Sequence, residues 1–148
     1  MTRWLMKLGL VLTLALTACH RDATPGDSCS IDDAGALDIA GRSDGFYGVV
    51  GQQVQPAPFA RFERVQRTGT GVEASSGKRW IGLRLGPEDA LALRQFTADP
   101  AGKSIAVIAG GEVASRHKVR VPLQTADVQV SCCNPRACER LQLLVPGP

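Results

Sequence analysis

Four cysteines are the residues of this sequence with the widest possible chemistry. They are Cys29, Cys132, Cys133 and Cys138. An even number of cysteines in an exported domain indicates disulfide bonds, and four cysteines allow three connectivities. A bridge between the neighbours Cys132 and Cys133 would close a strained ring. We therefore expect one of these two to pair with Cys138 and the other to pair with Cys29.

Metal binding and redox chemistry are the competing interpretations of these thiols. His117 would be the candidate for a fourth zinc ligand, but the chain has no Cys-x-x-Cys or His-x₃-His spacing to support such a site. A thioredoxin-like redox site also requires Cys-x-x-Cys. We predict structural disulfides, with no metal site and no cofactor.

A serine and a histidine could form a nucleophile and its base. Ser115 and His117 are two residues apart, so on a strand they would share a face. A hydrolase also needs an acid that orients the histidine and an oxyanion hole, and no Gly-x-Ser-x-Gly elbow is present. Glu88 and Asp89 are explained as acids in the first turn of a helix. We expect no catalytic residue, and an envelope hydrolase using His117 is the alternative.

A short basic stripe of three residues overlaps the segment that contains Ser115 and His117. Arg116, Lys118 and Arg120 alternate with other residues, which places them on one face of an extended chain. The first interpretation is the solvent face of a strand. The second is a docking edge for an acidic partner or for lipid headgroups.

The N-terminus has the pattern of an export signal. Arg3 and Lys7 precede an apolar run at 8–15 that is too short for a transmembrane helix. The following Leu16-Thr17-Ala18-Cys19 resembles the bacterial lipobox, which implies cleavage before Cys19 and acylation of that cysteine. Two or more acyl chains give stable anchoring to a bilayer. An ordinary signal peptide with Cys19 in a disulfide is the alternative.

The residue after the lipobox bears on which membrane would hold the protein. In enteric lipoproteins an Asp at this position favours retention in the inner membrane, and this chain has His20 there. The resemblance therefore favours the outer membrane, with the protein facing the periplasm.

Composition limits the classes of function. The chain has 148 residues, of which 44% are hydrophobic and 21% are charged, so a disordered chain and a polytopic membrane protein are excluded. Its 17 basic and 14 acidic residues form no basic tract, so we expect no nucleic-acid partner. Aromatic residues make up only 5%, which disfavours a stacking platform for bases or sugars.

Hydrophobic periodicity and turn residues predict the elements that must hold these groups. Pro87 and Pro135 each begin a helix, the second ending at Leu144. The glycines at 69, 71 and 77 predict a turn region, and Gly110-Gly111 predicts a hairpin turn. The segments with strand patterns are 46–50, 60–65, 80–85, 105–109, 112–115 and 127–131. This order predicts an α+β fold, a mostly antiparallel sheet with two helices on one face.

We divide the chain into four regions on these patterns. Residues 1–18 are the predicted signal peptide, and 19–36 form a polar tether. Residues 37–78 contain weakly patterned strands and loops, and 79–148 contain the sharply patterned α+β region.

The stretch from Ile81 to Pro146 resembles the periplasmic head subdomain of the SecD/SecDF protein-export factor. The matching positions lie at a helix start, at a loop, along a strand and hairpin, and on a final helix: Pro87, Glu88, Ala90, Leu93, Thr97, Gly102, Lys103, Ala106, Val107, Ile108, Gly111, Val113, Ser115, Ala137, Leu141 and Pro146. Gly110 replaces the family's Asp in the turn, and Arg116-His117 replaces its Ala-Pro.

The SecD resemblance implies a fold and a kind of partner. It implies envelope proteins or polypeptide chains as partners and a connection with protein export. It implies no translocation motor, since the transmembrane helices of that family are missing from this sequence. We therefore expect a membrane-anchored periplasmic lipoprotein that acts as a non-catalytic binding or accessory module.

Overall fold

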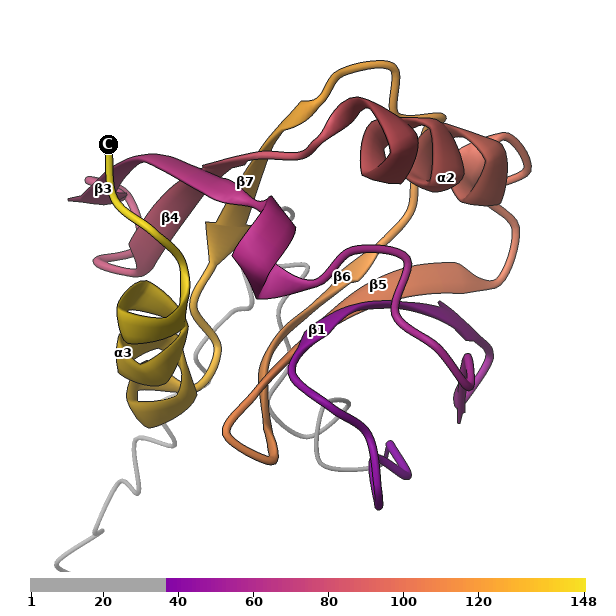
Figure 1. Ribbon diagram of the computed structural model, residues 1–148, viewed down its shortest axis with the longest axis horizontal. Coiled ribbons are helices and arrows are strands. Elements are labelled where there is room, and N and C mark those ends of the chain that lie inside the picture. Colours follow the sequence, from indigo (N-terminus) through magenta and orange to yellow (C-terminus); the bar gives the residue numbers. More distant parts are fainter. Residues whose placement is uncertain (1–36) are drawn as a thin grey trace, which may run out of the picture.

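The computed structural model describes residues 37–148, which form an α+β fold of antiparallel strands and two helices (Figure 1). The predicted signal peptide, the tether, Cys19 and Cys29 lie outside the described residues. In the part described, no helix combines the length and hydrophobicity needed to cross a membrane. The predicted fold class is confirmed.

The strands form two sheets, where the sequence patterns indicated one. The first sheet has the order β2-β1-β5-β6, and the second has the order β3-β4-β7. Every pairing is antiparallel. The strand bounds are β1 Gly45–Val50, β2 Gln53–Val54, β3 Gln66–Val72, β4 Arg79–Arg84, β5 Lys103–Ala109, β6 Glu112–Lys118 and β7 Asp127–Ser131.

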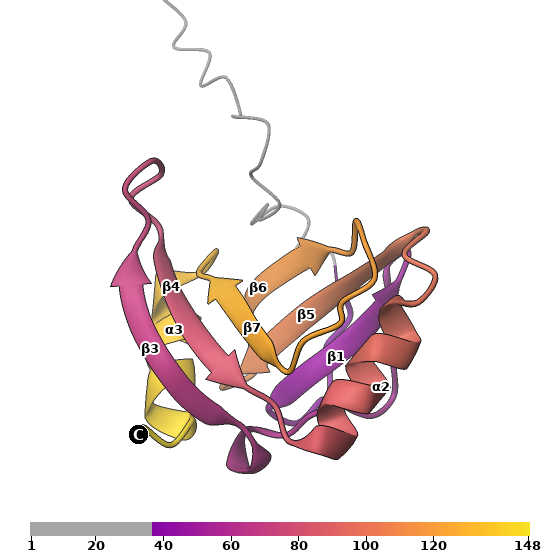
Figure 2. The same cartoon turned by 90° about the horizontal axis from the view of Figure 1, so that it is seen from above.

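The two sheets are inclined to each other and share one hydrophobic core (Figure 2). The inward faces of both sheets contribute to it, for example Val107 from β5 and Ile81 from β4. The far face of the first sheet packs in a second, smaller cluster that contains Tyr47, Val49 and Ile108. Both faces of β1 and β5 are therefore buried, which explains the continuous apolar run of β5.

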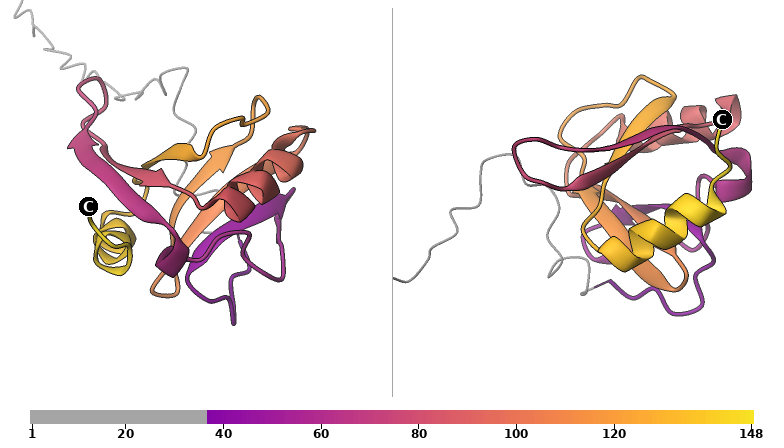
Figure 3. Two further views of the ribbon diagram at one scale, coloured as in Figure 1. Left: turned by 45° about the horizontal axis from the view of Figure 1, so that its top comes forward. Right: turned by 90° about the vertical axis from the view of Figure 1, so that its left-hand side faces the viewer.

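The helices begin where local signals predict. Helix α2 spans Pro87–Thr97 and helix α3 spans Pro135–Leu144, each with proline in its first turn. The Asn134 side chain accepts a hydrogen bond from the backbone N–H of Ala137, which caps α3. Helix α2 packs on the first sheet, where a Cβ atom on Gly48 would lie 2.7 Å from the Phe96 ring. Helix α3 lies at the other end of the molecule (Figure 3).

The hairpin between β5 and β6 also follows the prediction. Gly110 and Gly111 have φ angles of 62° and 79°, a conformation that glycine adopts without steric cost. The backbone N–H of Gly110 donates to the Asp44 carboxylate at 2.7 Å. This bond ties the hairpin to the segment before β1.

The strand predicted at 60–65 is wrong. Ala60 makes an isolated bridge with Phe46, and Phe62–Arg64 then form a 3₁₀ helix, η1. Phe62 and Val65 are both buried, and a 3₁₀ turn brings residues three apart onto one side. The Phe62 ring packs edge-on against Phe46 with centroids 5.4 Å apart.

The turn predicted across Gly69, Gly71 and Gly77 is correct only at its end. Gly77 has φ 68° in the β3–β4 turn, whereas Gly69 and Gly71 lie within β3. Gly71 is directly opposite Trp80, and a Cβ atom there would lie 2.6 Å from the indole ring. Glycine is needed at this position because the Trp80 side chain fills the space across the strand pair.

Candidate ligand-binding cavity

A cavity of about 480 Å³ lies between the two sheets. Its inner wall consists of buried apolar side chains, among them Phe46, Leu93 and Val107. Half-buried apolar side chains extend this wall toward the surface: Phe59, Ile105, Leu123 and Val128. The volume and the apolar lining are those of pockets that hold small molecules in other proteins.

The connecting loop, residues 119–126, forms the rim of the cavity between β6 and β7. Its two ends and its middle are anchored by hydrogen bonds to β5, to α2 and to Leu85, the residue that follows β4. The Val119 N–H donates to the Lys103 carbonyl at 3.0 Å, and the Leu123 N–H donates to the Thr97 hydroxyl at 3.0 Å. The Leu85 N–H donates to the Ala126 carbonyl at 2.9 Å. These bonds hold the rim in place over the apolar wall.

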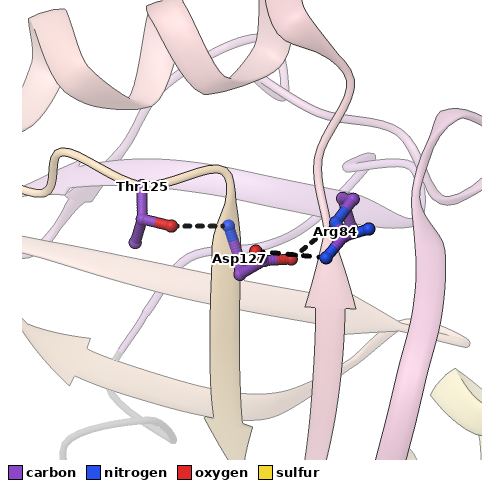
Figure 4. Close-up of polar contacts among 3 residues, drawn as sticks. All are labelled: Arg84, Thr125 and Asp127. Carbon is purple, nitrogen blue, oxygen red and sulfur yellow. Dashed lines mark hydrogen bonds and ion pairs between the residues drawn. The ribbon is translucent and has the colours of Figure 1, made fainter.

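An ion pair joins Arg84 of β4 to Asp127, which lines the cavity (Figure 4). The Arg84 Nε atom donates to Asp127 Oδ1 at 2.7 Å, and its Nη2 atom donates to Oδ2 at 3.3 Å. The Asp127 backbone N–H donates to the Thr125 hydroxyl at 3.0 Å. The bonded carboxylate raises the pKa of Arg84 further above its ordinary value. The negative charge of Asp127 is therefore neutralised at the cavity.

Two cations on the cavity lining have no such partner. Lys118 and Arg120 both line the cavity and are exposed. Within residues 37–148, neither of them forms an ion pair. Among residues 37–148, Asp127 is the one acidic residue of the lining. The unneutralised charge that these residues place at the mouth of the cavity is positive.

The basic stripe predicted at Arg116, Lys118 and Arg120 is wrong at its first member. Arg116 is buried, and its guanidinium group donates to Ser104 Oγ at 3.0 Å, to Gln52 Oε1 at 2.9 Å and to the Gly51 carbonyl at 2.6 Å. These acceptors hold the β1–β2 turn against β6. Arg116 therefore has a structural role, because a buried guanidinium needs acceptors for its donors.

The Ser115 hydroxyl and the His117 imidazole are not hydrogen-bonded to each other in the described part of the chain. The Ser115 hydroxyl is buried and has no hydrogen-bond partner in the described part of the chain. His117 lines the cavity and has a hydrogen bond with the backbone of Ser131. Burial lowers the pKa of His117 below its ordinary value, more than the Ser131 hydrogen bond raises it, and Lys78 lowers it further. The imidazole is therefore neutral at pH 7 and adds no charge to the cavity.

The acids at the start of α2 also have structural partners. The Asp89 carboxylate is buried and accepts a hydrogen bond from Arg64 at 2.6 Å. Burial raises the pKa of Asp89 above its ordinary value, although the Arg64 charge opposes this shift. Glu88 is exposed and lies 3.6 Å from the same arginine. This arrangement joins α2 to η1, away from the cavity.

The C-terminal cysteines form the predicted kind of cross-link. Cys132 is bonded to Cys138, with Cα atoms 5.8 Å apart, which ties the end of β7 to α3. Cys133 is also in a disulfide, and its partner is not among residues 37–148. The sulfur atoms of Cys132 and Cys138 are therefore bonded to each other and are not thiolate ligands. The Cys29 pairing stays a prediction.

The sequence patterns missed most of the cavity. Leu123, Thr125 and the rest of the connecting loop have no strand or helix period, so nothing in them indicated a shared site. Phe59 lies in a segment where Pro56 and Pro58 interrupt any strand or helix period. The signals were Lys118 and Arg120, which the docking interpretation singled out, and His117, which the hydrolase alternative singled out.

Comparison with known proteins bears on the fold. No family model and no curated protein sequence match the chain significantly. Solved structures of SecDF are similar to it. One is described as a membrane component that enhances protein export, with TM-score 0.49 and 15% identity, covering 65% of this chain and 43% of that chain. Another is SecDF in its super-membrane-facing form, with TM-score 0.51 and 18% identity, covering 67% of this chain and 14% of that chain.

The likeness to the super-membrane-facing form confirms the resemblance in fold to SecDF. At 18% identity it shows the fold alone. The match spans less than half of each SecDF chain.

Proposed function

We propose that the protein is a lipid-anchored, non-catalytic binding module of the cell envelope, with the inter-sheet cavity as its ligand site. The observation that carries this proposal is the combination of an apolar cavity with a rim held by hydrogen bonds. Of the polar side chains that line the cavity, three have structural hydrogen bonds, two are exposed cations and one is an exposed amide: His117, Thr125 and Asp127; Lys118 and Arg120; and Gln129. Binding, not bond cleavage, is the activity that such a lining supports.

A neutral fluorescent dye tests the binding site. Nile red should bind residues 20–148, which are the predicted mature chain without its acylated Cys19, and should gain fluorescence. This form is exported behind a signal peptide that lacks a lipobox. Leu123→Trp replaces an aliphatic side chain on the half-buried rim of the cavity with a larger aromatic one, so it should lower the affinity for the dye. Leu143→Trp is the matched control, because Leu143 is exposed on α3, which does not line the cavity. Equal binding by both variants would contradict the assignment.

The lipid anchor is supported by the lipobox-like Leu16 to Cys19. In cells fed a fatty-acid analogue, the wild-type protein should be labelled and Cys19→Ser should not, because acylation requires the thiol. Cys29→Ser is the matched control, since it removes a different N-terminal cysteine and should keep the label. A labelled Cys19→Ser protein would show that the lipobox interpretation is wrong. Fractionation of the labelled cells should place the protein in the outer membrane.

A connection with protein export is supported by the fold likeness to SecDF. We infer that envelope proteins or polypeptide chains in transit are partners of this module. A photo-crosslinking residue at the exposed Val121, on the connecting loop, should capture such proteins in living cells. Crosslinks that are the same from position 143 on α3 would contradict a specific partner surface at the loop.

A further inference from the structure

We propose that the cavity binds an anionic amphiphile, a single apolar chain that ends in a carboxylate, and that Lys118 and Arg120 hold the carboxylate at the mouth. This inference rests on the proposed binding function and names the chemical class of its ligand. It follows from the shape of the cavity, from the nature of its wall and from the charge around its opening.

The body of the ligand must be apolar and of limited size. A volume of about 480 Å³ is at the smaller end of the range for ligand pockets, which is about 300–1,000 Å³. The buried side chains on the inner wall, such as Phe46, Leu93 and Val107, offer no hydrogen-bonding group. A polar group at this depth would lose its hydration without compensation, which costs about 1–3 kcal/mol. An aliphatic chain loses nothing there and gains from burial.

The outer wall explains why the site favours an elongated ligand. Phe59, Ile105, Leu123 and Val128 are half-buried, so they continue the apolar surface from the interior to the rim. Apolar surface that remains partly exposed in a concave site indicates a place for a partner. A chain lying along this wall would cover it from the floor to the mouth.

The charge at the mouth selects the end group. Lys118 and Arg120 are exposed on the lining, and Asp127 is already neutralised by Arg84 at 2.7 Å. His117 is neutral at pH 7. Among residues 37–148, an anion at the rim would therefore meet two cations and no unpaired carboxylate. A cationic end group would be repelled there, and a neutral hydroxyl would gain a weaker hydrogen bond than a carboxylate.

Binding of dansyl-undecanoate and its displacement test the inference. Dodecanoate should displace this probe from the mature chain about ten times more effectively than dodecanol, since each exposed charge pair contributes about 0.2–1 kcal/mol. Dodecylammonium should be the weakest competitor. All measurements belong below the micelle-forming concentrations, and added salt should reduce the preference for dodecanoate because the cations are exposed.

A charge-reversal pair separates the specific site from general attraction. Lys118→Glu with Arg120→Glu should weaken dodecanoate binding about tenfold and remove its advantage over dodecanol. Arg61→Glu with Arg140→Glu is the matched control, because it makes the same change in net charge with exposed residues that do not line the cavity. Thermal melts check that both double variants fold. An equal loss in both would overturn the inference.

The outcomes distinguish this inference from the function on which it depends. If Nile red binds while dodecanoate and dodecanol compete equally, the cavity is a binding site and the assignment of the end group is wrong. If neither probe binds the wild-type protein, both proposals fail. Stronger competition by dodecylammonium than by dodecanoate would also overturn the assignment.

Discussion

His117 shows how the environment of one side chain decides its chemistry. On β6 it lines the inter-sheet cavity, and burial there lowers the pKa of the imidazole. The neutral form is therefore favoured in the folded protein. In the unfolded chain the same imidazole titrates near its ordinary value of about 6.5. The unfolded chain binds the proton first, so protonation of His117 opposes folding.

This difference predicts a dependence of stability on pH. The contribution of His117 to stability is fully present above about pH 6.5 and is lost as the pH falls from there toward the lowered pKa of the folded state. In urea unfolding, His117→Gln should show a smaller loss of unfolding free energy over this window than the wild type. His20→Gln is the matched control, because it replaces the other histidine of the chain. An unchanged slope in His117→Gln would contradict the prediction.

Arg116, on the same strand, shows that a charged side chain can be buried when hydrogen-bond acceptors surround it. Its position in the sequence suggested a solvent-facing stripe, but its guanidinium group lies against Ser104, Gln52 and Gly51. The neighbouring cations Lys118 and Arg120 are exposed. Burial and the available acceptors, not charge alone, separate a structural arginine from a candidate ligand contact.

At the scale of elements, the β3–β4 pair is organised around one indole ring. Trp80 lies across from Gly71 in the antiparallel register, and its ring also approaches Gly69. A Cβ atom on Gly71 would lie 2.6 Å from the ring, whereas the nearest ring atom to a Cβ on Gly69 would be 3.8 Å away. Gly69 therefore has room for a Cβ atom, whereas Gly71 has room for one only if the Trp80 ring moves.

Substitution of these two glycines tests the packing. Gly71→Ala should displace the Trp80 ring and lower the unfolding free energy by about 1 kcal/mol. Gly69→Ala meets only ordinary contacts, so it should be neutral or stabilise by about 0.4–1 kcal/mol through the unfolded chain. Trp80 is the only tryptophan beyond the predicted signal peptide, so its fluorescence reports directly on the ring. Equal stability of the two variants would show that the ring moves without cost.

At the scale of the whole molecule, the disulfide-bonded cysteines of residues 37–148 all lie near the C-terminus, between Cys132 and Cys138. The Cys132–Cys138 bond joins β7 to α3, and Cys133 is bonded outside residues 37–148. If Cys133 pairs with Cys29 as predicted, a loop of about 100 residues is closed, which would stabilise the protein by up to about 4.7 kcal/mol in the chain-entropy model. The predicted tether would then be fixed to the C-terminal corner.

Thiol counting tests this connection. The protein of residues 20–148, denatured without reduction, should have no free thiol. Cys29→Ser should expose one thiol, and mass spectrometry should identify it as Cys133. Its melting temperature should fall by several degrees, because the long loop is no longer closed. A free thiol at Cys132 or Cys138 in this variant would contradict the predicted pairing.

Local signals in the sequence were sufficient for several elements. Proline at Pro87 and Pro135, with the polar residues around them, determined where both helices begin, because the geometry of a first helical turn depends on a few adjacent residues. The same holds for the hairpin at Gly110-Gly111, whose positive φ angles are a property of glycine itself. The period of two along 127–131 was sufficient for β7.

The tertiary structure alone decided how these elements form a site. The division into two sheets depends on which strands pair, and β1 pairs with β5 across more than fifty intervening residues. The 3₁₀ turn at Phe62 forms because its ring packs on Phe46, and Arg116 is buried because acceptors from the β1–β2 turn reach it. Hydrophobic burial is non-directional, and hydrogen bonds between distant segments depend on how those segments are arranged in space. Neither effect produces a periodic pattern in the local sequence. The cavity between the sheets exists only through those long-range contacts.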